Sequence, residues 1–452
     1  MDLKGKKVLV VGLGKSGLAA ALFLRRRGAQ VTVSDVRSAE ALAKDIPALL
    51  EEGIMVETGG HGLLTFRRQD LIVISPGVPM ETPELAQVRS FGLPVIGEIE
   101  LAARFLKGNY IAITGSNGKT TTTALLGEIL QEAGMRTLVG GNIGVPVVAL
   151  IDESTDDSWS VLEVSSFQLE STEKFHPRIA VILNITPDHL DRHGTFENYA
   201  MAKERIFTAQ TEQDFVVLNA DNARAAGAAS RSSGKVYWFS IEHAVEQGAW
   251  VQDGYVLFRM APDAATESIV PIGSIPLKGE HNVENVLAAV CAARLAGATA
   301  QAVQKAIESF KAVEHRLEYV ATLNGVEFFN DSKATNVDAT AKAIAAFPGG
   351  VHLILGGKDK NSDYTQLSHL LRERVRAVYT IGSAAAKIES QLRGMVPLHS
   401  CETLDKAVGA AASAAHPGEV VLLAPACSSF DQFENYEHRG RVFKELVRER
   451  KG

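Results

Sequence analysis

The sequence predicts an α/β protein of three domains, with a Rossmann-like domain at each end and a central P-loop domain built on a mostly parallel sheet. Three observations point to this fold class. Short apolar runs alternate with helical patterns along most of the 452 residues. A glycine-rich turn, Gly12–Gly17, follows the first apolar run, and a second glycine-rich turn ends in Gly118-Lys119-Thr120. A chain of this length is also typical of about three domains.

The first predicted domain covers residues 1–108 and opens with a dinucleotide-type turn. A strand at residues 7–11 runs into Gly12-Leu13-Gly14-Lys15-Ser16-Gly17, a helix is expected over residues 18–27, and the next strand ends at Asp35. The pattern G-x-G-x-x-G with an acid about 20 residues later is typical of a pyrophosphate bound at a helix N-terminus. Taken alone the pattern suggests that NAD binds here, although the motif itself indicates only a pyrophosphate near a helix N-terminus.

A further strand of this domain, at residues 70–75, ends in the turn Pro76-Gly77-Val78-Pro79. Ligands of open parallel sheets bind beyond the carboxyl ends of the strands. We therefore expect a ligand near Ser16, Asp35, Arg37 and Ser75.

The second predicted domain, residues 109–313, carries the most informative segment of the chain. The apolar run Ile111–Thr114 ends in Gly115-Ser116-Asn117-Gly118-Lys119-Thr120-Thr121, and a helical pattern begins near Thr122. In a phosphate-binding loop of this kind, backbone N–H groups bind an anion, the lysine contacts the outer phosphates and the next hydroxyl binds Mg²⁺. Only two residues separate Gly115 from Gly118-Lys119, whereas the usual nucleotide loop has four. The segment predicts ATP binding, and the alternative is a strand-to-helix turn with an incidental lysine.

Strands and helices continue to alternate through the second domain and through the third, residues 314–452. In the second domain we expect strands at 160–164, 179–184, 216–219 and 236–239, hairpin-like runs over 245–275 and a helix over 282–295. In the third domain we expect strands at 326–329, 351–355, 377–381 and 420–423, and a helix over 337–347. This alternation predicts parallel sheets with helices on their faces.

Composition excludes several functional classes. The formal net charge of −7 argues against a nucleic-acid partner. No apolar run approaches the roughly 20 residues that span a bilayer, and the N-terminus lacks the pattern of a signal peptide. The three cysteines, Cys291, Cys401 and Cys427, are widely spaced and odd in number, which suggests a reducing compartment and hence the cytoplasm.

Two polar segments follow predicted strands of the second domain. Glu163 lies near the end of an apolar strand, where a carboxylate needs a metal or a lysine as its partner unless it faces water. The next strand leads into Asn184–His193, which contains two histidines, two aspartates and an arginine. That segment either binds a ligand or caps a helix. His189 would be an unusual ligand for Mg²⁺, because Mg²⁺ prefers oxygen.

Three other residues of the second domain are interpreted more simply from their pattern. Lys203, within a helical stretch, has the pattern of an ordinary solvated lysine. Asn282 and Asn285, one helical turn apart, could cap a helix or contact a nucleotide base. Capping is favoured, because Asn is a preferred N-cap residue.

Two polar loops of the third domain also follow strands. Asn330–Asn336 gathers polar residues and one lysine in front of a helix, which makes either a carboxylate site or a capped helix start. Pro425–Phe433 follows the last strand in the same way, and two such loops on one sheet would face each other across a switch point. Cys427 in the second loop is a weak candidate nucleophile, because no activating base is evident.

Several of these segments occur together in the order found in a known family. They are Thr114–Thr121, Asn184–His193, His281-Asn282, Glu314-His315-Arg316 and Asn330–Asn336. With these segments the chain resembles the Mur ligase family of ATP-dependent amino-acid ligases, and within it the branch that adds D-glutamate to UDP-N-acetylmuramoyl-L-alanine in peptidoglycan precursor synthesis. The resemblance covers essentially the whole chain, and Asn330–Asn336 and Ser428–Phe433 are its most specific parts. The resemblance accounts for the two residues between Gly115 and Gly118-Lys119, because the phosphate loop of this family has that spacing. It also implies that the first domain holds the uridine diphosphate of the substrate rather than NAD.

The resemblance also implies residue roles. Lys119, Glu163, His189 and Lys203 would be catalytic. Two Mg²⁺ ions would be bound by Thr120, Glu163, His189 and Lys203, with Lys203 carbamylated by CO₂ and so offering oxygen to the metal. ATP would contact Gly115, Ser116, Asn117, Gly118, Lys119, Thr120, Thr121, Asn282, Asn285, Arg316 and Asp331. The UDP-substrate would contact Gly14, Lys15, Ser16, Asp35, Arg37, Ser75, Gly77 and Asn142, and D-glutamate would contact Lys333, Thr335, Lys360, Ser429 and Phe430.

The implied reaction transfers the γ-phosphate of ATP to the L-alanine carboxylate, and the amine of D-glutamate then displaces phosphate. All partners would be small molecules, with no membrane and no nucleic acid, and the protein would be a monomer. Phe430 departs from the family pattern, where a smaller apolar residue is common. Two alternatives stay open: folylpolyglutamate synthase, which does not begin with a module like Gly12–Gly17, and an NAD-binding regulator or oxidoreductase with an accessory ATPase domain.

Overall fold

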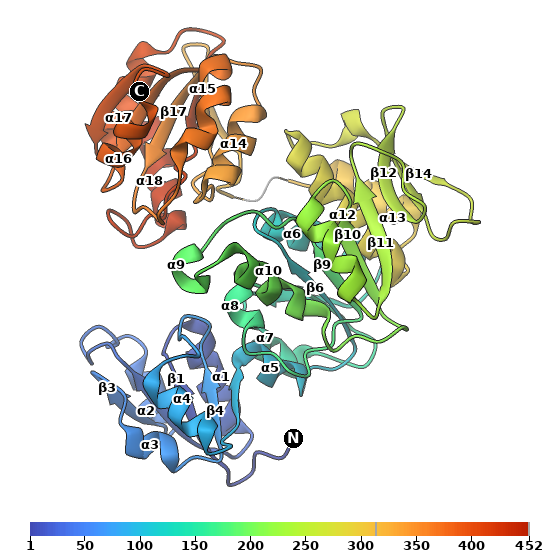
Figure 1. Ribbon diagram of the computed structural model, residues 1–452, viewed down its shortest axis with the longest axis vertical. Coiled ribbons are helices and arrows are strands. Elements are labelled where there is room, and N and C mark those ends of the chain that lie inside the picture. The colour runs from blue at the N-terminus through green and yellow to red at the C-terminus, as the bar shows by residue number, and fades with distance from the viewer. Residues whose placement is uncertain (312–313, 451–452) are drawn as a thin grey trace. The chain divides into compact units, whose positions relative to one another are not determined.

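A computed structural model describes residues 1–311 and 314–450 and contains three sheets with helices on their faces (Figure 1). The predicted α/β fold class is confirmed. The chain divides into two compact units, one made of residues 1–185, 200–270 and 286–306, the other of residues 186–199, 271–285 and 307 onwards. The predicted boundary at residue 313 lies outside the described residues. Among the described helices, none has the length and apolarity needed to cross a membrane.

The first sheet is entirely parallel and has five strands in the order β3-β2-β1-β4-β5. Because β1 is followed by β2 on one side and β4 on the other, the crevice at their carboxyl ends is a topological switch point. The strands are β1 Lys7–Val11, β2 Gln30–Asp35, β3 Met55–Thr58, β4 Leu71–Ile74 and β5 Val95–Gly97. The helices are α1 Lys15–Arg26, α2 Ile46–Glu51, α3 Leu63–Arg67, α4 Pro83–Ser90 and α5 Glu98–Ala103.

The second sheet has nine strands in the order β14-β13-β12-β11-β10-β9-β6-β8-β7, and β12 pairs with β13 as the antiparallel hairpin expected within residues 245–275. Its strands are β6 Asn109–Thr114, β7 Thr137–Gly141, β8 Trp159–Glu163, β9 Ile179–Ile182, β10 Phe215–Asn219, β11 Lys235–Ser240, β12 Gly248–Gln252, β13 Tyr255–Arg259 and β14 Glu267–Pro271. The helices of this stretch of chain are α6 Lys119–Glu132, α7 Val147–Leu150, α8 Ser166–Leu169, α9 Leu190–His193, α10 Phe196–Glu204, α11 Ala223–Ala226, α12 Glu280–Ala296 and α13 Ala300–Ser309. The pairs of β6 with β8 and β9 are parallel, which brings the ends of these three strands to one edge.

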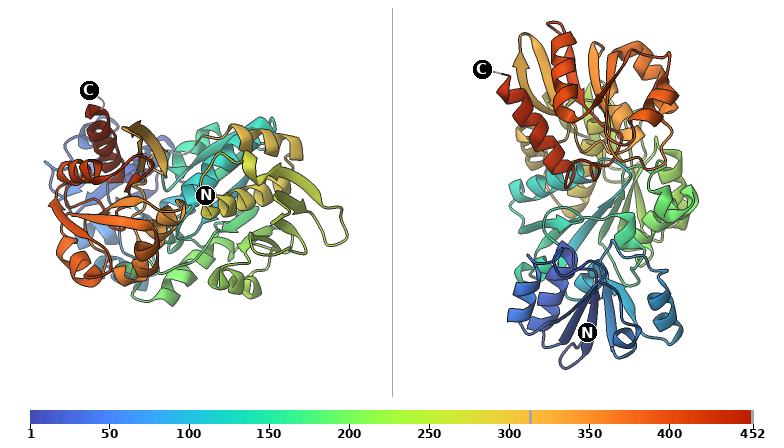
Figure 2. Two further views of the ribbon diagram at one scale, coloured as in Figure 1. Left: turned by 90° about the horizontal axis from the view of Figure 1, so that it is seen from above. Right: turned by 90° about the vertical axis from the view of Figure 1, so that its left-hand side faces the viewer.

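The third sheet has six strands in the order β15-β16-β20-β17-β18-β19 and is parallel except for the β15–β16 pair. Its strands are β15 Glu318–Leu323, β16 Val326–Asn330, β17 Val351–Gly356, β18 Val375–Ile381, β19 Leu398–Glu402 and β20 Val420–Leu423. Its helices are α14 Val337–Ala345, α15 Ser368–Arg374, α16 Ala385–Leu392, α17 Leu404–Ala414 and α18 Tyr436–Glu449. One apolar cluster packs the strands against α14, α15 and α16, and a second packs them against α17 and α18, so both faces are covered (Figure 2).

The predicted element bounds differ from the structure in two systematic ways. Two helices begin earlier than the apolar periodicity suggests: α1 starts at Lys15 rather than residue 18, and α6 starts at Lys119 rather than near Thr122. Their first turns are polar, so the helical period is not visible there. The five strands that the pattern did not reveal, β3, β5, β7, β15 and β19, all lie at sheet edges.

Candidate active site

The phosphate loop connects β6 to α6 and is braced by the strand next to it. Gly115 and Gly118 have φ of 153° and 90°, a region that glycine adopts without strain. A Cβ on Gly115 would also lie 3.0 Å from Leu183 Cβ. Asn184, just beyond β9, accepts hydrogen bonds from the backbone N–H groups of Ser116 and Asn117, each at 2.9 Å. Asn184 therefore fixes the backbone of the loop just before the helix begins.

Two lysine ammonium groups converge on one carbonyl of this loop. Lys119 Nζ donates to the carbonyl oxygens of Gly115, at 2.8 Å, and Ser116, at 3.0 Å. Lys203 Nζ, from α10, also donates to the Gly115 carbonyl, at 2.8 Å. Lys203 is only 2% exposed, so the interpretation of it as a solvated helix lysine is wrong. The helical pattern of α10 gives no sign of the loop that packs over this lysine.

Glu163 ends β8 as a buried carboxylate beside the loop. One oxygen accepts a hydrogen bond from Thr120 Oγ1 at 2.7 Å, and the other accepts one from Asn142 Nδ2 at 3.2 Å. Asn142 is itself held by its backbone N–H, which donates to the Glu163 carbonyl at 2.8 Å. Both side-chain donors are neutral, and the Glu163 side chain is buried, with 2% of the residue exposed. Such an oxygen-rich cluster suits a hard cation.

His189 belongs to the second compact unit and shares an aspartate with Lys360. It has the left-handed φ of 53° just before α9. Its Nε2 lies 3.6 Å from Asp188 Oδ2, and Lys360 Nζ lies 3.6 Å from Asp188 Oδ1. Burial alone would raise the pKa of Asp188, but Lys360, His189 and a hydrogen bond from Asn336 hold it below its usual value. The Asp188 carboxylate therefore lies close both to His189, a predicted metal ligand, and to Lys360, a predicted D-glutamate contact.

Asn282 and Asn285 lie inside α12, so the capping interpretation is wrong. The helix begins two residues before Asn282, whose Nδ2 donates back to the Lys278 carbonyl at 2.7 Å. Asn285 Nδ2 donates to Asn282 Oδ1 at 3.1 Å, which joins the pair. Both side chains are buried. In the same unit, Asp331 follows β16, accepts from the Leu317 N–H at 3.3 Å, and has its pKa raised by burial to about 6.

The loop that follows β16 holds two more predicted contacts. Lys333 Nζ lies 5.3 Å from the centre of the Tyr436 ring, and its backbone N–H donates to the His315 carbonyl. Thr335 donates its backbone N–H to the Lys333 carbonyl, and Asn336 caps α14 through a hydrogen bond from the Ala339 N–H at 2.8 Å. The loop is therefore a capped helix start, and that interpretation does not exclude ligand binding.

The loop that follows β20 is partly buried and partly exposed. Ser429 is 2% exposed, whereas Phe430 is 67% exposed and is one of the most exposed large apolar side chains of the described chain. Cys427 is buried against the Tyr364 hydroxyl at 2.9 Å, and burial raises the pKa of its thiol to about 11. The low weight given to Cys427 as a nucleophile agrees with this environment, because a thiol so protonated attacks poorly.

Sequence reasoning missed Arg439, which joins these two loops. Its guanidinium is fully buried and donates to Ser332 Oγ at 3.0 Å, the Ser332 carbonyl at 2.8 Å and the Cys427 carbonyl at 3.1 Å. In the sequence it is one arginine in a charged, amphipathic helix, and that pattern indicates a solvated position. Only the packing of α18 reveals it.

The seven residues predicted for the UDP-substrate in the first sheet line a single cavity of about 340 Å³. They are Gly14, Lys15, Ser16, Asp35, Arg37, Ser75 and Gly77. Asp35 accepts the Leu13 N–H at 2.7 Å and three hydrogen bonds from Arg37. Burial opposes ionisation, but these bonds lower the pKa of Asp35 to about 2. Asp35 thus braces the turn and Arg37 at the wall of the cavity.

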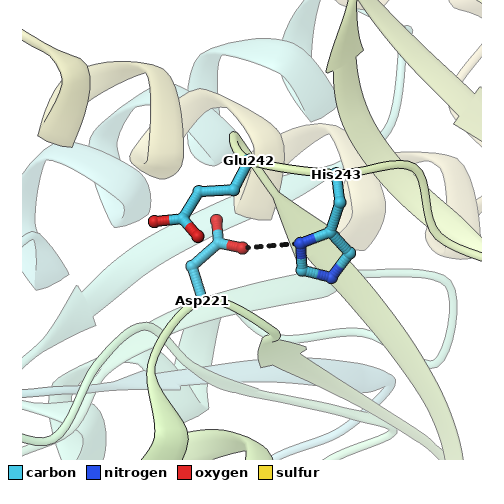
Figure 3. Close-up of side chains that lie close together, drawn as sticks. All are labelled: Asp221, Glu242 and His243. Atoms are coloured by element: carbon cyan, nitrogen blue, oxygen red, sulfur yellow. Dashed lines mark ion pairs between the residues drawn. The ribbon is translucent and has the colours of Figure 1, made fainter.

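A second carboxylate–histidine cluster lies beyond the ends of β10 and β11 (Figure 3). Asp221 accepts hydrogen bonds from Ser240 Oγ at 2.6 Å and from the Ile241 N–H at 2.7 Å, and His243 Nδ1 lies 3.4 Å from it. The side chains of Glu242 and His243 are exposed. These contacts close the turn after β11, and this is sufficient to explain the cluster.

Three family models match consecutive parts of the chain. They describe a Mur ligase MurD-like N-terminal domain over residues 6–97, a Mur ligase middle domain over 113–293 and a Mur ligase glutamate ligase domain over 315–427. Each match contains one of the three sheets or most of it.

Relatives and solved structures agree with these matches. The chain is 72% identical over 452 residues to UDP-N-acetylmuramoylalanine–D-glutamate ligase of Acidobacterium capsulatum, covering 100% of this chain and 98% of the relative. It is 61% identical to the enzyme of the same name from Koribacter versatilis, covering 99% and 98%. The fold is similar to a pseudomurein peptide ligase type C from Methanothermus fervidus (TM-score 0.62, 20% identity, 98% and 100% covered). It is equally similar to the MurF ligase of Thermotoga maritima in complex with ADP (TM-score 0.62, 19% identity, 99% and 96% covered). The chain belongs to the Mur ligase family.

Proposed function

We propose that the chain is the ligase that adds D-glutamate to UDP-N-acetylmuramoyl-L-alanine at the expense of ATP. The observation that carries the proposal is the grouping of a phosphate loop with the hydrogen-bonded pair Thr120 and Glu163 at the ends of neighbouring parallel strands, together with the buried Lys203 that donates to the loop. The identity of 72% to a relative with that activity in its name supports the choice of substrates.

ATP would lie on the loop Gly115–Thr121, with its phosphates on the N–H groups at the start of α6. Lys119, whose ammonium now donates to two loop carbonyls, is within reach of the outer phosphates by rotation of its side chain. Asn282, Asn285, Arg316 and Asp331 complete the proposed nucleotide contacts. The buried asparagine pair is suited to a nucleotide base, because each amide offers both a donor and an acceptor.

Magnesium fits the oxygen-rich set beside the loop. A hydroxyl from Thr120 already contacts the Glu163 carboxylate, and Mg²⁺ prefers such ligands. When bound, Mg²⁺ would offset negative charge on the phosphate that is transferred. His189 and Lys203 are the proposed ligands of a second ion. Carbamylation of Lys203 by CO₂ would replace a buried ammonium by a carboxylate-like oxygen donor.

The first sheet would hold the uridine diphosphate of the substrate in the cavity bounded by Gly14–Ser16, Asp35, Arg37 and Ser75–Gly77. The N-terminus of α1 suits its diphosphate. Asn142, hydrogen-bonded to Glu163, would lie by the reacting end of the substrate.

D-Glutamate would contact the loops after β16 and β20. Lys333 and Thr335 come from the first loop and Ser429 and Phe430 from the second, with Lys360 near the side-chain carboxylate. Two cations suit an amino acid with two carboxylates. Arg439 donates hydrogen bonds to both loops, which supports a fixed spacing between them.

The chemistry then needs no nucleophile from the protein. The L-alanine carboxylate attacks the γ-phosphorus of ATP, the bond to the β,γ-bridging oxygen breaks and ADP leaves. The unprotonated amine of D-glutamate attacks the acyl carbon, and phosphate leaves from the tetrahedral intermediate. Lys119 offsets charge on the phosphoryl group in the first step. We further propose the functional division 1–108, 109–313 and 314–452, a cytoplasmic location and a monomer.

The test is phosphate release from ATP by the purified protein. It is supplied with UDP-N-acetylmuramoyl-L-alanine and with D- and L-amino acids in turn. We expect release with D-glutamate and a product of the corresponding mass. Turnover with a folate substrate instead, or tight NAD binding without UDP-sugar binding, would overturn the proposal in favour of one of the two alternatives.

A further inference from the structure

His61 lines the cavity of the first sheet beside Arg37, although no sequence motif singles it out. It follows β3, after Gly59 and Gly60, whose φ values of 78° and 146° suit glycine. The Gly59 N–H donates to the Arg37 carbonyl at 2.8 Å and the Gly60 N–H to the Asp35 carbonyl at 3.4 Å. The loop that carries His61 is therefore tied to the loop that carries Arg37.

The ring of His61 is held in one orientation. Its Nδ1 lies 2.7 Å from Ser34 Oγ, on a serine that is fully buried in β2, and its ring packs edge-on against Phe66 at 5.6 Å. Ser34 Oγ has only a long alternative acceptor, the Gly60 carbonyl at 3.4 Å. The Ser34 hydroxyl can donate to Nδ1, and the imidazole then carries its proton on Nε2. His61 thus offers an N–H donor in a cavity wall.

The order of the strands indicates which part of the substrate would lie next to the His61 N–H. The diphosphate belongs at the N-terminus of α1, above β1, and the cavity extends from there to β4 on one side and to β2 and β3 on the other. The chain leaves the sheet on the β4 side, through β5 and α5, where Glu98 accepts the Val148 N–H of the next sheet's helices. The sugar and its L-alanine would extend that way for the alanine carboxylate to be phosphorylated, which leaves the β2–β3 side for the uridine.

The groups on that side are complementary to a pyrimidine. Arg37 directs its Nε and Nη2 donors to Asp35 and Leu13, while 48% of its side chain stays exposed, so its flat face is available for stacking. Val36 is 65% exposed beside it. Uracil presents two carbonyl acceptors at its edge, and the His61 N–H is the matching donor.

We propose that His61 is a uracil-recognition residue, donating from Nε2 to a pyrimidine carbonyl. This inference rests on the proposed function, because it takes the cavity to hold UDP. Ser34 is the positioning residue that fixes the ring.

The experiment compares UDP with ribose 5-diphosphate, which lacks the base, in binding to the full-length protein by calorimetry. For His61→Ala we expect about 5- to 20-fold weaker UDP binding and unchanged ribose 5-diphosphate binding. His61→Gln, which retains an N–H donor, should recover part of the loss, and Ser34→Ala should show a smaller loss of the same kind. The KM for UDP-N-acetylmuramoyl-L-alanine should rise in parallel, with kcat and the KM for D-glutamate unchanged.

Equal weakening of both ligands by His61→Ala would overturn the uracil contact, as would unchanged binding of both. His369→Ala, an exposed histidine of α15 in the third sheet's layer, is the matched control and should bind UDP like the parent protein. Failure of the proposed function is recognised separately, because the parent protein would then show neither UDP binding nor D-glutamate ligation.

Discussion

Replacing Lys203 by alanine separates its roles in stability and in catalysis. The side chain is 2% exposed, so the change removes three buried methylene groups and the Nζ hydrogen bond to the Gly115 carbonyl. The methylenes contribute about 0.8 kcal/mol each. The carbonyl keeps a donor, because Lys119 Nζ also lies 2.8 Å from it. We therefore expect a loss of about 2–4 kcal/mol in the free energy of unfolding, rather than the roughly 0.5 kcal/mol of an exposed lysine.

Activity should fall much further than this stability loss explains. Lys203→Met restores most of the buried volume and should cost only about 1 kcal/mol, yet it should be as inactive as Lys203→Ala. If the lysine is a carbamate ligand, short-chain carboxylic acids should partly restore activity to Lys203→Ala, since they can place an oxygen in the space left by the side chain.

The assay is ADP release at saturating substrates, alongside chemical unfolding of the same samples. Lys305→Ala, an exposed lysine of α13, is the control and should change neither quantity by much. Near-normal activity of Lys203→Met would refute the catalytic role. Loss of activity without any rescue by formate, acetate or propionate would count against the carbamate and leave only the brace on the phosphate loop.

Three further changes test other parts of the molecule. Lys119→Ala should lower ADP release by at least about 100-fold while calorimetry shows UDP-substrate binding nearly unchanged, and a parallel loss of binding would contradict the separate sites. Lys333→Ala should raise the KM for D-glutamate about 10-fold or more but leave the KM for ATP nearly unchanged, and L-glutamate should be a poor substrate of the parent protein; equal turnover of both enantiomers would be inconsistent with two fixed carboxylate anchors. Glu98 is fully buried, and burial raises its pKa from 4.5 to about 7 although its Oε1 accepts the Val148 N–H at 2.8 Å. Its contribution to stability is therefore complete below pH 4.5 and is lost as the pH rises to about 7, a change of about 3 kcal/mol. Glu98→Gln should remove that pH dependence, and unfolding curves between pH 4.5 and 8 that change identically in both proteins would show that Glu98 is already solvated.

The sequence by itself determined the fold class and the central strands. β1, β6, β9, β17 and β20 are buried on both faces, so their residues are almost continuously apolar and easily recognised. The missed strands lie at edges and are half-exposed, as in β3 and β19. Because the core covers only part of each strand, their residues form no continuous apolar run in the sequence. The polar first turns of α1 and α6 likewise contain no apolar periodicity.

The phosphate loop and the first glycine-rich turn were also readable from the sequence, because their chemistry depends on local backbone geometry and a few adjacent side chains. The surroundings of Lys203, Arg439 and His61 were not. Each is a polar residue whose neighbours in the sequence resemble those of a solvated position, and each acquires its partner from a segment far away: Gly115, Ser332 and Ser34. Burial and hydrogen-bond partners of this kind follow from how strands and helices pack. Only the tertiary structure could decide them.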